Sequence, residues 1–275
     1  MKIAVHQMCS GVSTNANARA MAEAIYQASA EGAAMYFAPE MSILIDRDRG
    51  RAASNVVAES ESEAISQVAE AAKRHKIWVH LGSVPVRSEE GTKFANRSMV
   101  IDPDGIIRAR YDKMHMFDVD LATGEYWRES AAYLGGGGPV AVETPMGLMG
   151  LSICYDLRFP DLYSAYVKAG VDVLAIPSAF TVPTGQAHWH ILVRARAIEA
   201  QAFVIAAAQS GRHQDGRETF GHSLVVDPWG EILLDMEAGE GLGFAEIDLS
   251  RIQEVRAQIP VRTNGRNIDM AVRHF

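Results

Sequence analysis

A ten-residue pattern occurs twice in this chain of 275 residues, and it constrains the fold more than any other feature. Ser98–Ile107 reads SMVIDPDGII and Ser223–Ile232 reads SLVVDPWGEI, at an offset of 125 residues. Each copy joins two apolar runs through a Pro-x-Gly turn, which is typical of a β-hairpin. Upstream, EGAAMYFAP at 31–39 is echoed by KAGVDVLAIP at 168–177. Chance similarity of common turns explains one match more easily than two in the same order, so we predict two equivalent halves.

The rest of the chain alternates between apolar runs and amphipathic patterns, which indicates an α/β layered domain. Each half is predicted to run strand, helix, strand, helix, strand, hairpin, giving a pseudo-twofold sandwich of two sheets with helices outside. No Ser/Gly linker separates the halves, so residues 1–275 are expected to form one domain. In the first half we expect strands at Lys2–Met8, Ala34–Glu40 and 77–86, a helix at Asn15–Glu31, and a second helix that a capping box at Ser60–Glu63 opens and that runs to about His75.

Composition excludes several classes of function. The 34 acidic residues outnumber the 26 Lys and Arg, and the net charge of −8 argues against a nucleic-acid or anionic-membrane surface. No apolar stretch approaches the ~20 residues of a membrane span, and the apolar run after Lys2 is too short for a signal peptide. Two cysteines cannot make a disulfide framework, so a reducing cytoplasm is the simpler expectation.

Chemically useful side chains follow the predicted strands at equivalent places in the two halves. Met8 and Cys9 end the first strand of one half, and Cys154 ends the first strand of the other. Glu40 and Ser178 each follow the proline after the second strand. Because ligand sites in α/β sheets favour the carboxyl ends of strands, we expect these ends to converge on a site.

Cys154 has two interpretations. Pro160 suits the first turn of a helix, so Cys154 is expected near a helix N-terminus, where the pKa of a thiol falls and its nucleophilicity rises. The alternative is a structural core cysteine. Glu40 is unusual at the end of a buried strand unless it has a partner, and Lys113 leaves the first hairpin into an apolar stretch. The alternative for both is an exposed loop charge.

Three segments resemble the signature segments of the nitrilase superfamily of carbon-nitrogen hydrolases. They are FAPE with Glu40, YDKMHMFD with Lys113 and GLSICYDLRFP with Cys154, in the family's order and spacing. The similarity covers nearly the whole chain. It implies a four-layer α-β-β-α sandwich that assembles as a homodimer or larger homo-oligomer, with the helix at 161–169 and the tail at 259–275 as candidate subunit contacts.

The resemblance also implies roles for individual residues. Cys154 matches the nucleophile, Glu40 the general base, Lys113 the residue that stabilises the tetrahedral intermediate, and Glu129 a second glutamate near the lysine. The backbone N–H of Tyr155 would assist Lys113. The loop at 121–138 has no regular pattern, and its four glycines (135–138) lack a following Lys-Ser/Thr, so they are expected to form a flexible connection rather than a phosphate loop.

Substrate specificity is expected to depend on Arg158, four residues past Cys154. Its guanidinium either clamps a substrate carboxylate or pairs with Asp156 or Asp161. His188 and His190 are two residues apart and do not face each other on a helix, so no metal site is expected there, and no cofactor is expected. The residues predicted to line the pocket with Tyr155 and Arg158 are Phe180, Thr181, Thr184 and His188.

Within the superfamily, these segments are most similar to the omega-amidase and deaminated glutathione amidase branch. That branch implies a hydrolase that cleaves the terminal carbon–nitrogen bond of a small carboxylate-bearing amide through a cysteine thioester and releases ammonia. The alternatives are an N-carbamoyl amino acid amidohydrolase and, less favoured, a nitrilase. From other classes, the alternatives are a thiol redox protein, which the absence of a CxxC motif disfavours, and an inactive scaffold.

Overall fold

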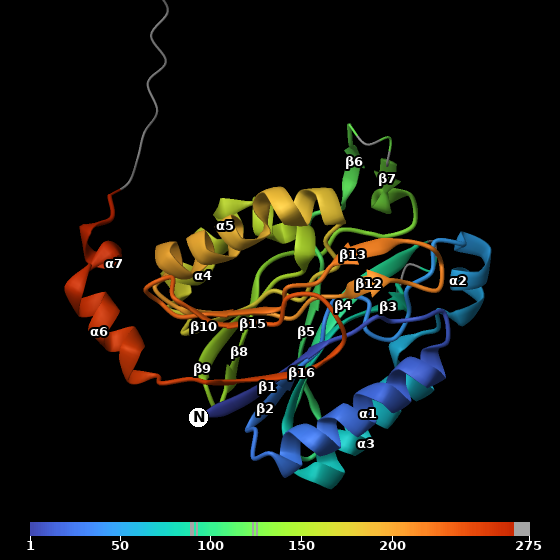
Figure 1. The fold of residues 1–275 in the computed structure, drawn as a ribbon, viewed down its shortest axis with the longest axis horizontal. Coiled ribbons are helices and arrows are strands. Elements are labelled where there is room, and N and C mark those ends of the chain that lie inside the picture. The colour runs from blue at the N-terminus through green and yellow to red at the C-terminus, as the bar shows by residue number, and fades with distance from the viewer. Residues whose placement is uncertain (89–90, 92, 123, 125, 267–275) are drawn as a thin grey trace, which may run out of the picture.

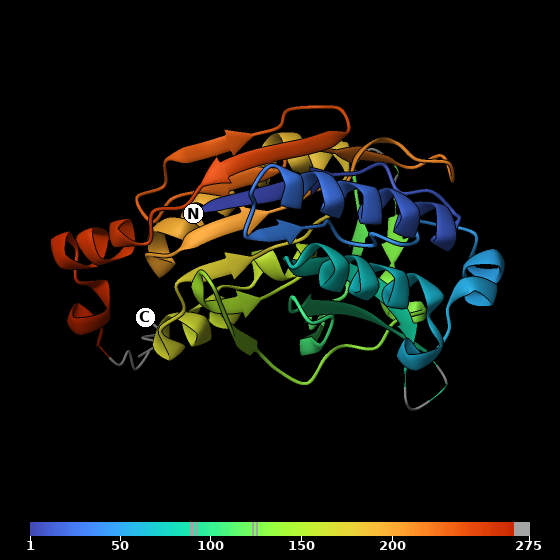
Figure 2. The ribbon, with the colours of Figure 1, turned by 90° about the horizontal axis from the view of Figure 1, so that it is seen from below.

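The structure, a computed structural model, describes residues 1–266 apart from 89, 90, 92, 123 and 125. Two six-stranded sheets face each other, with α1 (Thr14–Ala30) and α3 (Glu63–His75) outside the first and α4 (Pro160–Ala169) and α5 (Val182–Ala200) outside the second (Figure 1; Figure 2). The predicted four-layer α-β-β-α sandwich is therefore confirmed.

Strand order is equivalent in the two sheets. The first sheet runs, edge to edge, through β16 (Gly241–Glu246), β1 (Lys2–Gln7), β2 (Met35–Phe37), β3 (Trp78–Arg87), β4 (Phe94–Ile101) and β5 (Ile107–Asp112). The second runs through β8 (Val140–Thr144), β9 (Gly147–Leu151), β10 (Val173–Ala175), β11 (Phe203–Ala206), β14 (Leu224–Val226) and β15 (Ile232–Asp235). In both sheets the middle three strands are parallel and the remaining pairs are antiparallel. The sheets differ in the origin of one edge strand. In the second sheet, β8 comes directly before its partner β9 in the chain. In the first sheet, β16 comes from the C-terminal part of the chain and returns to pair with β1.

The two predicted hairpins share their turn chemistry. The N–H of Gly105 donates to Asp102 O, and the N–H of Gly230 donates to Asp227 O, both at 2.9 Å. Each hairpin also has a bulge at the same register, next to Ile101 in one and next to Val226 in the other. The internal repeat of the sequence is thus a repeat of structure.

Packing explains why the strands read as continuous apolar runs. One face of the first sheet, including Val5 and Phe37, packs against Leu151 and Phe203 of the second sheet in a core between the sheets. The opposite face, including Tyr36, packs under α1 and α3. Strands covered on both faces have no solvent-facing side, so their sequences do not alternate.

The start of α3 differs from the prediction. Ser62, not Ser60, caps the helix by accepting a hydrogen bond from the N–H of Ile65. Residues 59–61 instead form a 3-10 turn, η1 (Glu59–Glu61), because Glu59 is held by Arg97 and Arg110 of the first sheet at 2.9 and 2.7 Å.

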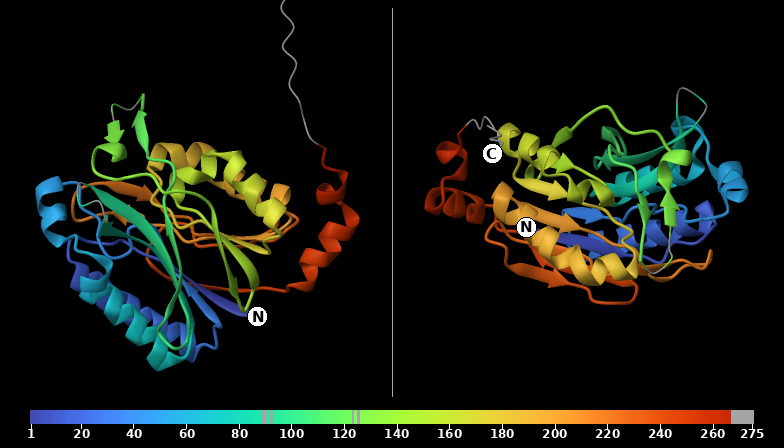
Figure 3. Two further views of the ribbon diagram at one scale, coloured as in Figure 1. Left: turned by 180° about the vertical axis from the view of Figure 1, so that it is seen from behind. Right: turned by 90° about the horizontal axis from the view of Figure 1, so that it is seen from above.

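Smaller elements surround the sandwich. A ribbon of β6 (Asp118–Asp120) and β7 (Tyr126–Arg128) stands out from the body at the end where α2 (Arg49–Asn55) and the pair β12 (Ser210–Arg212) and β13 (Glu218–Phe220) lie (Figure 1; Figure 3). At the opposite end, α6 (Ser250–Gln258) and α7 (Val261–Asn264) extend beyond the sheets. Residues 267–275 of the proposed subunit contact lie outside the described residues. In the described part of the chain, no helix has the length and apolar character needed to cross a membrane.

Candidate active site

Glu40 is positioned by a close approach between the chain after β2 and a bulge in β3. Gly82 lies in the bulge with φ of 74°, and a Cβ built on it would lie 2.0 Å from Pro39 O. Only glycine therefore allows the Pro39 segment to pass. The turn that follows buries Glu40, which is 5% exposed.

Lys113 follows β5 and is fixed through its backbone on both sides. Its N–H donates to Asn96 O at 2.9 Å, and its carbonyl accepts from the N–H of Gly136 at 2.8 Å. A Cβ on Gly136 would lie 2.0 Å from Asp112 O. The prediction that the glycines 135–138 form a flexible connection is therefore wrong for this part of the segment, because its backbone packs against the end of β5.

Cys154 begins a tight 3-10 turn, η3 (Cys154–Arg158), at the end of β9. Its φ of 49° lies in the left-handed region, which a residue with a side chain occupies at a cost, and its N–H donates to Pro177 O at 3.0 Å. Pro160 does begin α4, as predicted, but Cys154 begins the turn that precedes this helix rather than lying at the N-terminus of the helix itself.

The pKa of the Cys154 thiol is raised well above its usual value, so the predicted lowering is wrong. Burial is the largest cause and the Glu40 carboxylate adds to it, while Lys113 and the backbone N–H of Ala179 act in the opposite direction. A resting thiol that is neutral needs a base before it can act as a nucleophile.

The structure brings Glu40, Lys113 and Glu129 into one buried cluster. The ammonium Nζ of Lys113 lies 2.9 Å from Glu40 Oε1 and 2.8 Å from Glu129 Oε2. Burial alone would lower the pKa of Lys113, but Glu129 and Glu40 outweigh it and raise the pKa well above its usual value. Lys113 is therefore held as a cation beside the Cys154 thiol.

Glu129 comes from a segment whose sequence has no regular pattern, and the structure shows regular elements there. The β6–β7 ribbon precedes it, and Glu129 opens the 3-10 turn η2 (Glu129–Ala131). Its Oε2 also accepts from the N–H of Phe117 at 2.7 Å. The ribbon therefore aims the carboxylate back at Lys113.

Sequence reasoning missed two polar residues that organise the cluster. Asn96 Nδ2 donates to Glu40 Oε1 at 3.0 Å from within β4, where Asn96 is one of three consecutive polar residues and nothing in the sequence singles it out. Asp156 is completely buried and accepts from Tyr111 Oη at 2.7 Å, the N–H of Ile153 at 2.9 Å and the N–H of His115 at 3.0 Å. It thereby ties the chain on both sides of Lys113 to the Cys154 turn.

A cleft of about 1280 Å³ opens above the cluster. Among the described residues, none accepts a hydrogen bond from the backbone N–H of Tyr155 next to the sulfur. Of the predicted pocket residues, the cleft is lined by Tyr155, Arg158, Phe180, Thr181 and Thr184. His188 does not line it and instead contacts Arg158, with 3.2 Å between Nδ1 and Nη2.

Arg158 pairs with neither Asp156 nor Asp161, the ion pairs predicted as the alternative to binding a substrate carboxylate. Within the described part of the chain it has no salt-bridge partner, and Asp156 is occupied as above. Its guanidinium lies 5.5 Å from the centre of the Phe180 ring. A cation at the cleft without a carboxylate partner is available to an anionic ligand.

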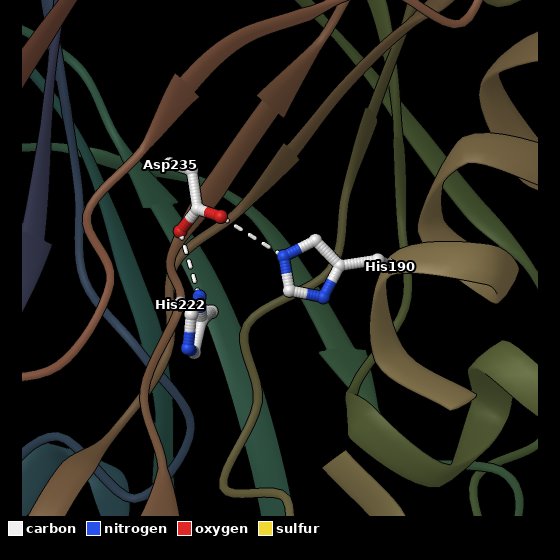
Figure 4. Close-up of side chains that lie close together, drawn as sticks. All are labelled: His190, His222 and Asp235. Carbon is white, nitrogen blue, oxygen red and sulfur yellow. Dashed lines mark hydrogen bonds and ion pairs between the residues drawn. The ribbon is translucent and has the colours of Figure 1, made fainter. Parts of the chain in front are cut away.

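Figure 4 shows a separate cluster on the outside of the second sheet, formed by His190, His222 and Asp235. The Asp235 carboxylate lies 2.9 Å from His190 Nε2 and 2.9 Å from His222 Nδ1. Three such groups are able to ligate a metal ion, although here the carboxylate already bridges both imidazoles. His188 is not part of this cluster and contacts Arg158 instead.

The family model for carbon-nitrogen hydrolases matches residues 2–257 of this chain. The chain belongs to the carbon-nitrogen hydrolase family. It is therefore a hydrolase acting on carbon–nitrogen bonds other than peptide bonds, within the nitrilase superfamily, as the three segments predicted.

Individual family members agree in sequence and in fold. A deaminated glutathione amidase from Yersinia enterocolitica is 37% identical over 98% of this chain and 94% of its own. The crystal structure of the C. elegans NitFhit protein superimposes with a TM-score of 0.89 at 38% identity, over 96% of this chain and 65% of that one. Nit3 from Saccharomyces cerevisiae, described as a member of branch 10 of the nitrilase superfamily, has a TM-score of 0.85 at 29% identity, over 95% and 94% of the two chains.

Proposed function

We propose that this hydrolase is a thiol amidase in which Cys154 attacks the carbonyl carbon of a small amide that carries a carboxylate. The observation that carries the proposal is the buried Glu40–Lys113–Glu129 cluster beside a neutral thiol. Such an ionic cluster is costly as mere structure, because each charge must be desolvated. The free-energy cost of burying these charges is explained if they act on a reacting group.

In the first step, Glu40 accepts the proton of Cys154 as the sulfur–carbon bond forms. Negative charge then develops on the carbonyl oxygen. Lys113 and the unpaired N–H of Tyr155 are the donors available to stabilise it. Removing one such donor typically costs on the order of 10²–10³ in rate.

In the second step, Glu40 returns its proton to the leaving nitrogen as the carbon–nitrogen bond breaks, and a thioester remains on Cys154. Water then attacks the thioester carbon while Glu40 accepts a proton from it. The acid leaves, and the proton on Glu40 returns to the sulfur. Glu129 keeps Lys113 charged and oriented throughout, because it contacts the ammonium through both oxygens, at 3.0 and 2.8 Å.

We further propose that deaminated glutathione is the substrate, as the name of the Yersinia enterocolitica relative suggests. In this compound a five-carbon 2-oxo acid is joined by an amide to cysteinylglycine. Its nitrogen would leave as the amine of the dipeptide, whereas a primary omega-amide would release ammonia. Arg158 supports either, since it offers a free cation for the 2-oxo acid carboxylate.

Product analysis tests the proposal. The enzyme is incubated with deaminated glutathione, 2-oxoglutaramate, an N-carbamoyl amino acid and a nitrile, and the 2-oxoglutarate, cysteinylglycine and ammonia released are measured. We expect the highest kcat/KM for deaminated glutathione, with equal amounts of 2-oxoglutarate and cysteinylglycine. Turnover of only the carbamoyl compound or the nitrile would contradict the assignment.

The cellular compartment, domain organisation and oligomeric state of the enzyme are part of the same proposal. Both cysteines are free thiols, which supports a reducing cytoplasm. We also propose that residues 1–275 form one domain, supported by the return of β16 to β1, and that the chain forms a homodimer or larger homo-oligomer. Light scattering coupled to size-exclusion chromatography measures the assembly.

A further inference from the structure

We infer that Arg47, Trp127 and Arg217 form a second carboxylate subsite, which binds the acidic end of the amine that leaves. This inference rests on the proposed function and deepens it, because it assigns a carboxylate to each side of the scissile amide. Arg158 would take the one on the acyl side. The three residues of the second subsite all line the cleft and come from separate segments: the loop before α2, the strand β7 and the turn between β12 and β13.

The indole of Trp127 organises the subsite. The guanidinium carbon of Arg47 lies 5.4 Å from the ring centre, and that of Arg217 lies 5.0 Å from it. Stacking on an aromatic ring holds a guanidinium in place without using its N–H donors. The Nε1 atom of Trp127 is itself buried and has no acceptor among the described residues. A buried donor of this kind calls for a partner, which a bound ligand or water supplies.

The guanidinium groups of this wall keep N–H donors that no carboxylate among the described residues accepts. Arg217 donates through Nε to Asp215 at 3.0 Å, which leaves its two terminal nitrogens without a carboxylate. Arg47 has no ion-pair partner within the described part of the chain. The nearby Asp46 is occupied by Arg51, at 2.6 and 2.8 Å. Of the remaining acids in this wall, Asp48 caps α2 and Glu218 is exposed.

A chain of aromatic rings joins the second subsite to the reaction centre. Phe117 connects the subsite to the reaction centre, since its ring centre lies 6.4 Å from Trp127 and 5.1 Å from Tyr155, the neighbour of Cys154. Two residues of extended chain cover about 7 Å. The terminal carboxylate of a dipeptide amine lies about that far from the scissile bond, in the cleft that the two arginines also line, whereas ammonia would leave the subsite empty.

Tyr133 lines the same cleft and is influenced by both Arg217 and the catalytic cluster. Burial and Glu129 raise the pKa of this phenol, while Arg217 and Lys113 act on it in the opposite direction. Tyr133 is therefore within electrostatic range of both the catalytic cluster and the subsite.

Three substrates that differ only beyond the scissile bond test the inference. They are deaminated glutathione, the same compound with its terminal carboxylate converted to a carboxamide, and 2-oxoglutaramate. Arg47→Gln, Arg217→Gln and the double variant are compared with Arg74→Gln, which removes an exposed charge on α3 remote from the cleft. Michaelis constants and kcat are measured for each enzyme and substrate.

We expect each subsite variant to raise KM for deaminated glutathione on the order of tenfold, the effect of one charge-assisted contact, with kcat nearly constant. KM for the carboxamide and for 2-oxoglutaramate should stay within about twofold of wild type, as should all constants of Arg74→Gln. Equal effects on all three substrates, no effect on any, or a wild-type enzyme that prefers the carboxamide would overturn the subsite. The proposed amidase function would stand in those cases, and it fails separately if wild type cleaves none of the amides.

Discussion

The two halves of this enzyme share a scaffold and divide the chemistry between them. Val5 pairs with Phe37 in the first sheet as Leu151 pairs with Ala175 in the second. Three residues after each of these positions, the halves differ. The first has Met8 and Glu40, and the second has Cys154 and Ser178.

The same backbone positions therefore serve different purposes. Met8 forms an ordinary bridge with Gln209, whereas Cys154 takes a left-handed conformation that exposes its sulfur to the cleft. Ser178 donates its hydroxyl to Ile176 O, whereas Glu40 faces Lys113. The repeated fold makes the strand ends converge, and the proposed mechanism takes its nucleophile from one half and its base from the other.

The largest effect should come from comparing the two cysteines. Cys154→Ala removes the nucleophile, and we expect amidase kcat to fall by about 10⁴-fold or more, with the melting temperature retained. Cys9→Ala should keep nearly full activity, because its thiol lies 3.7 Å from His213 Nδ1 and Cys9 is not among the described residues that line the cleft. Steady-state kinetics and thermal unfolding measure kcat and the melting temperature of both variants. An active Cys154→Ala enzyme would contradict the proposed mechanism.

The next comparison is between Glu40 and Ser178. Glu40→Gln keeps the shape but removes the base, so kcat should fall by about 10²–10⁴-fold. Ser178→Ala removes one buried hydroxyl that contacts only backbone, so it should cost about 1 kcal/mol of unfolding free energy and leave kcat within a few fold. Similar kcat losses in the two variants would mean that Glu40 acts through packing rather than proton transfer.

Most of the fold could be predicted because its signals are local. Asp-Pro-x-Gly turns specify a hairpin from a few adjacent residues, and they occur in both halves. The predictions that failed depended on contacts distant in sequence. Ser60 lost the helix cap to Ser62 because arginines of the sheet hold Glu59, and the pKa of Cys154 rises because burial and Glu40 act on it.

The candidate site was predictable where the residue types are chemically distinctive. Lys113 and Cys154 lie in specific motifs, and the repeat predicts that the strand ends carrying Glu40 and Cys154 converge. Arg47 and Trp127 had no such signal, because an arginine in a polar loop and a tryptophan in an irregular segment read as surface until the tertiary structure brings them together.

A third prediction concerns Asp156, whose carboxylate joins the halves through Tyr111 of β5 and Ile153 at the end of β9. Asp156→Asn weakens these bonds and should displace Lys113 from Cys154, lowering kcat by about 10–100-fold. Asp227→Asn is the matched control, because that carboxylate also accepts backbone N–H groups, within one hairpin, and its other oxygen pairs with Arg251 rather than with any residue of the cluster. Both variants should lose stability, and only Asp156→Asn should lose kcat. Equal kcat values would confine Asp156 to a structural role.

The smallest effect should come from the edge strands, which the two halves fasten differently. Arg110 and Asp235 occupy equivalent positions, opposite Met99 and Leu224, and each holds its strand through charged partners. Arg110 binds Glu59, whereas Asp235 binds His190 and His222. Burial raises the pKa of Asp235, but hydrogen bonds from His190, the N–H of Glu237 and His222 outweigh it and hold the pKa below its ordinary value.

A carboxyl whose pKa is lower in the folded state stabilises the fold above its unfolded pKa of about 3.9, and this contribution is lost as pH falls through the folded value. Asp235→Asn should therefore cost at most about 1 kcal/mol at pH 7, since the group is partly exposed, and the cost should vanish towards pH 3. Urea unfolding of wild type, Asp235→Asn and Arg110→Gln across this range measures the difference. A loss of unfolding free energy in Asp235→Asn that is constant down to pH 3 would show that the Asp235 side chain stabilises β15 through packing rather than through its charge.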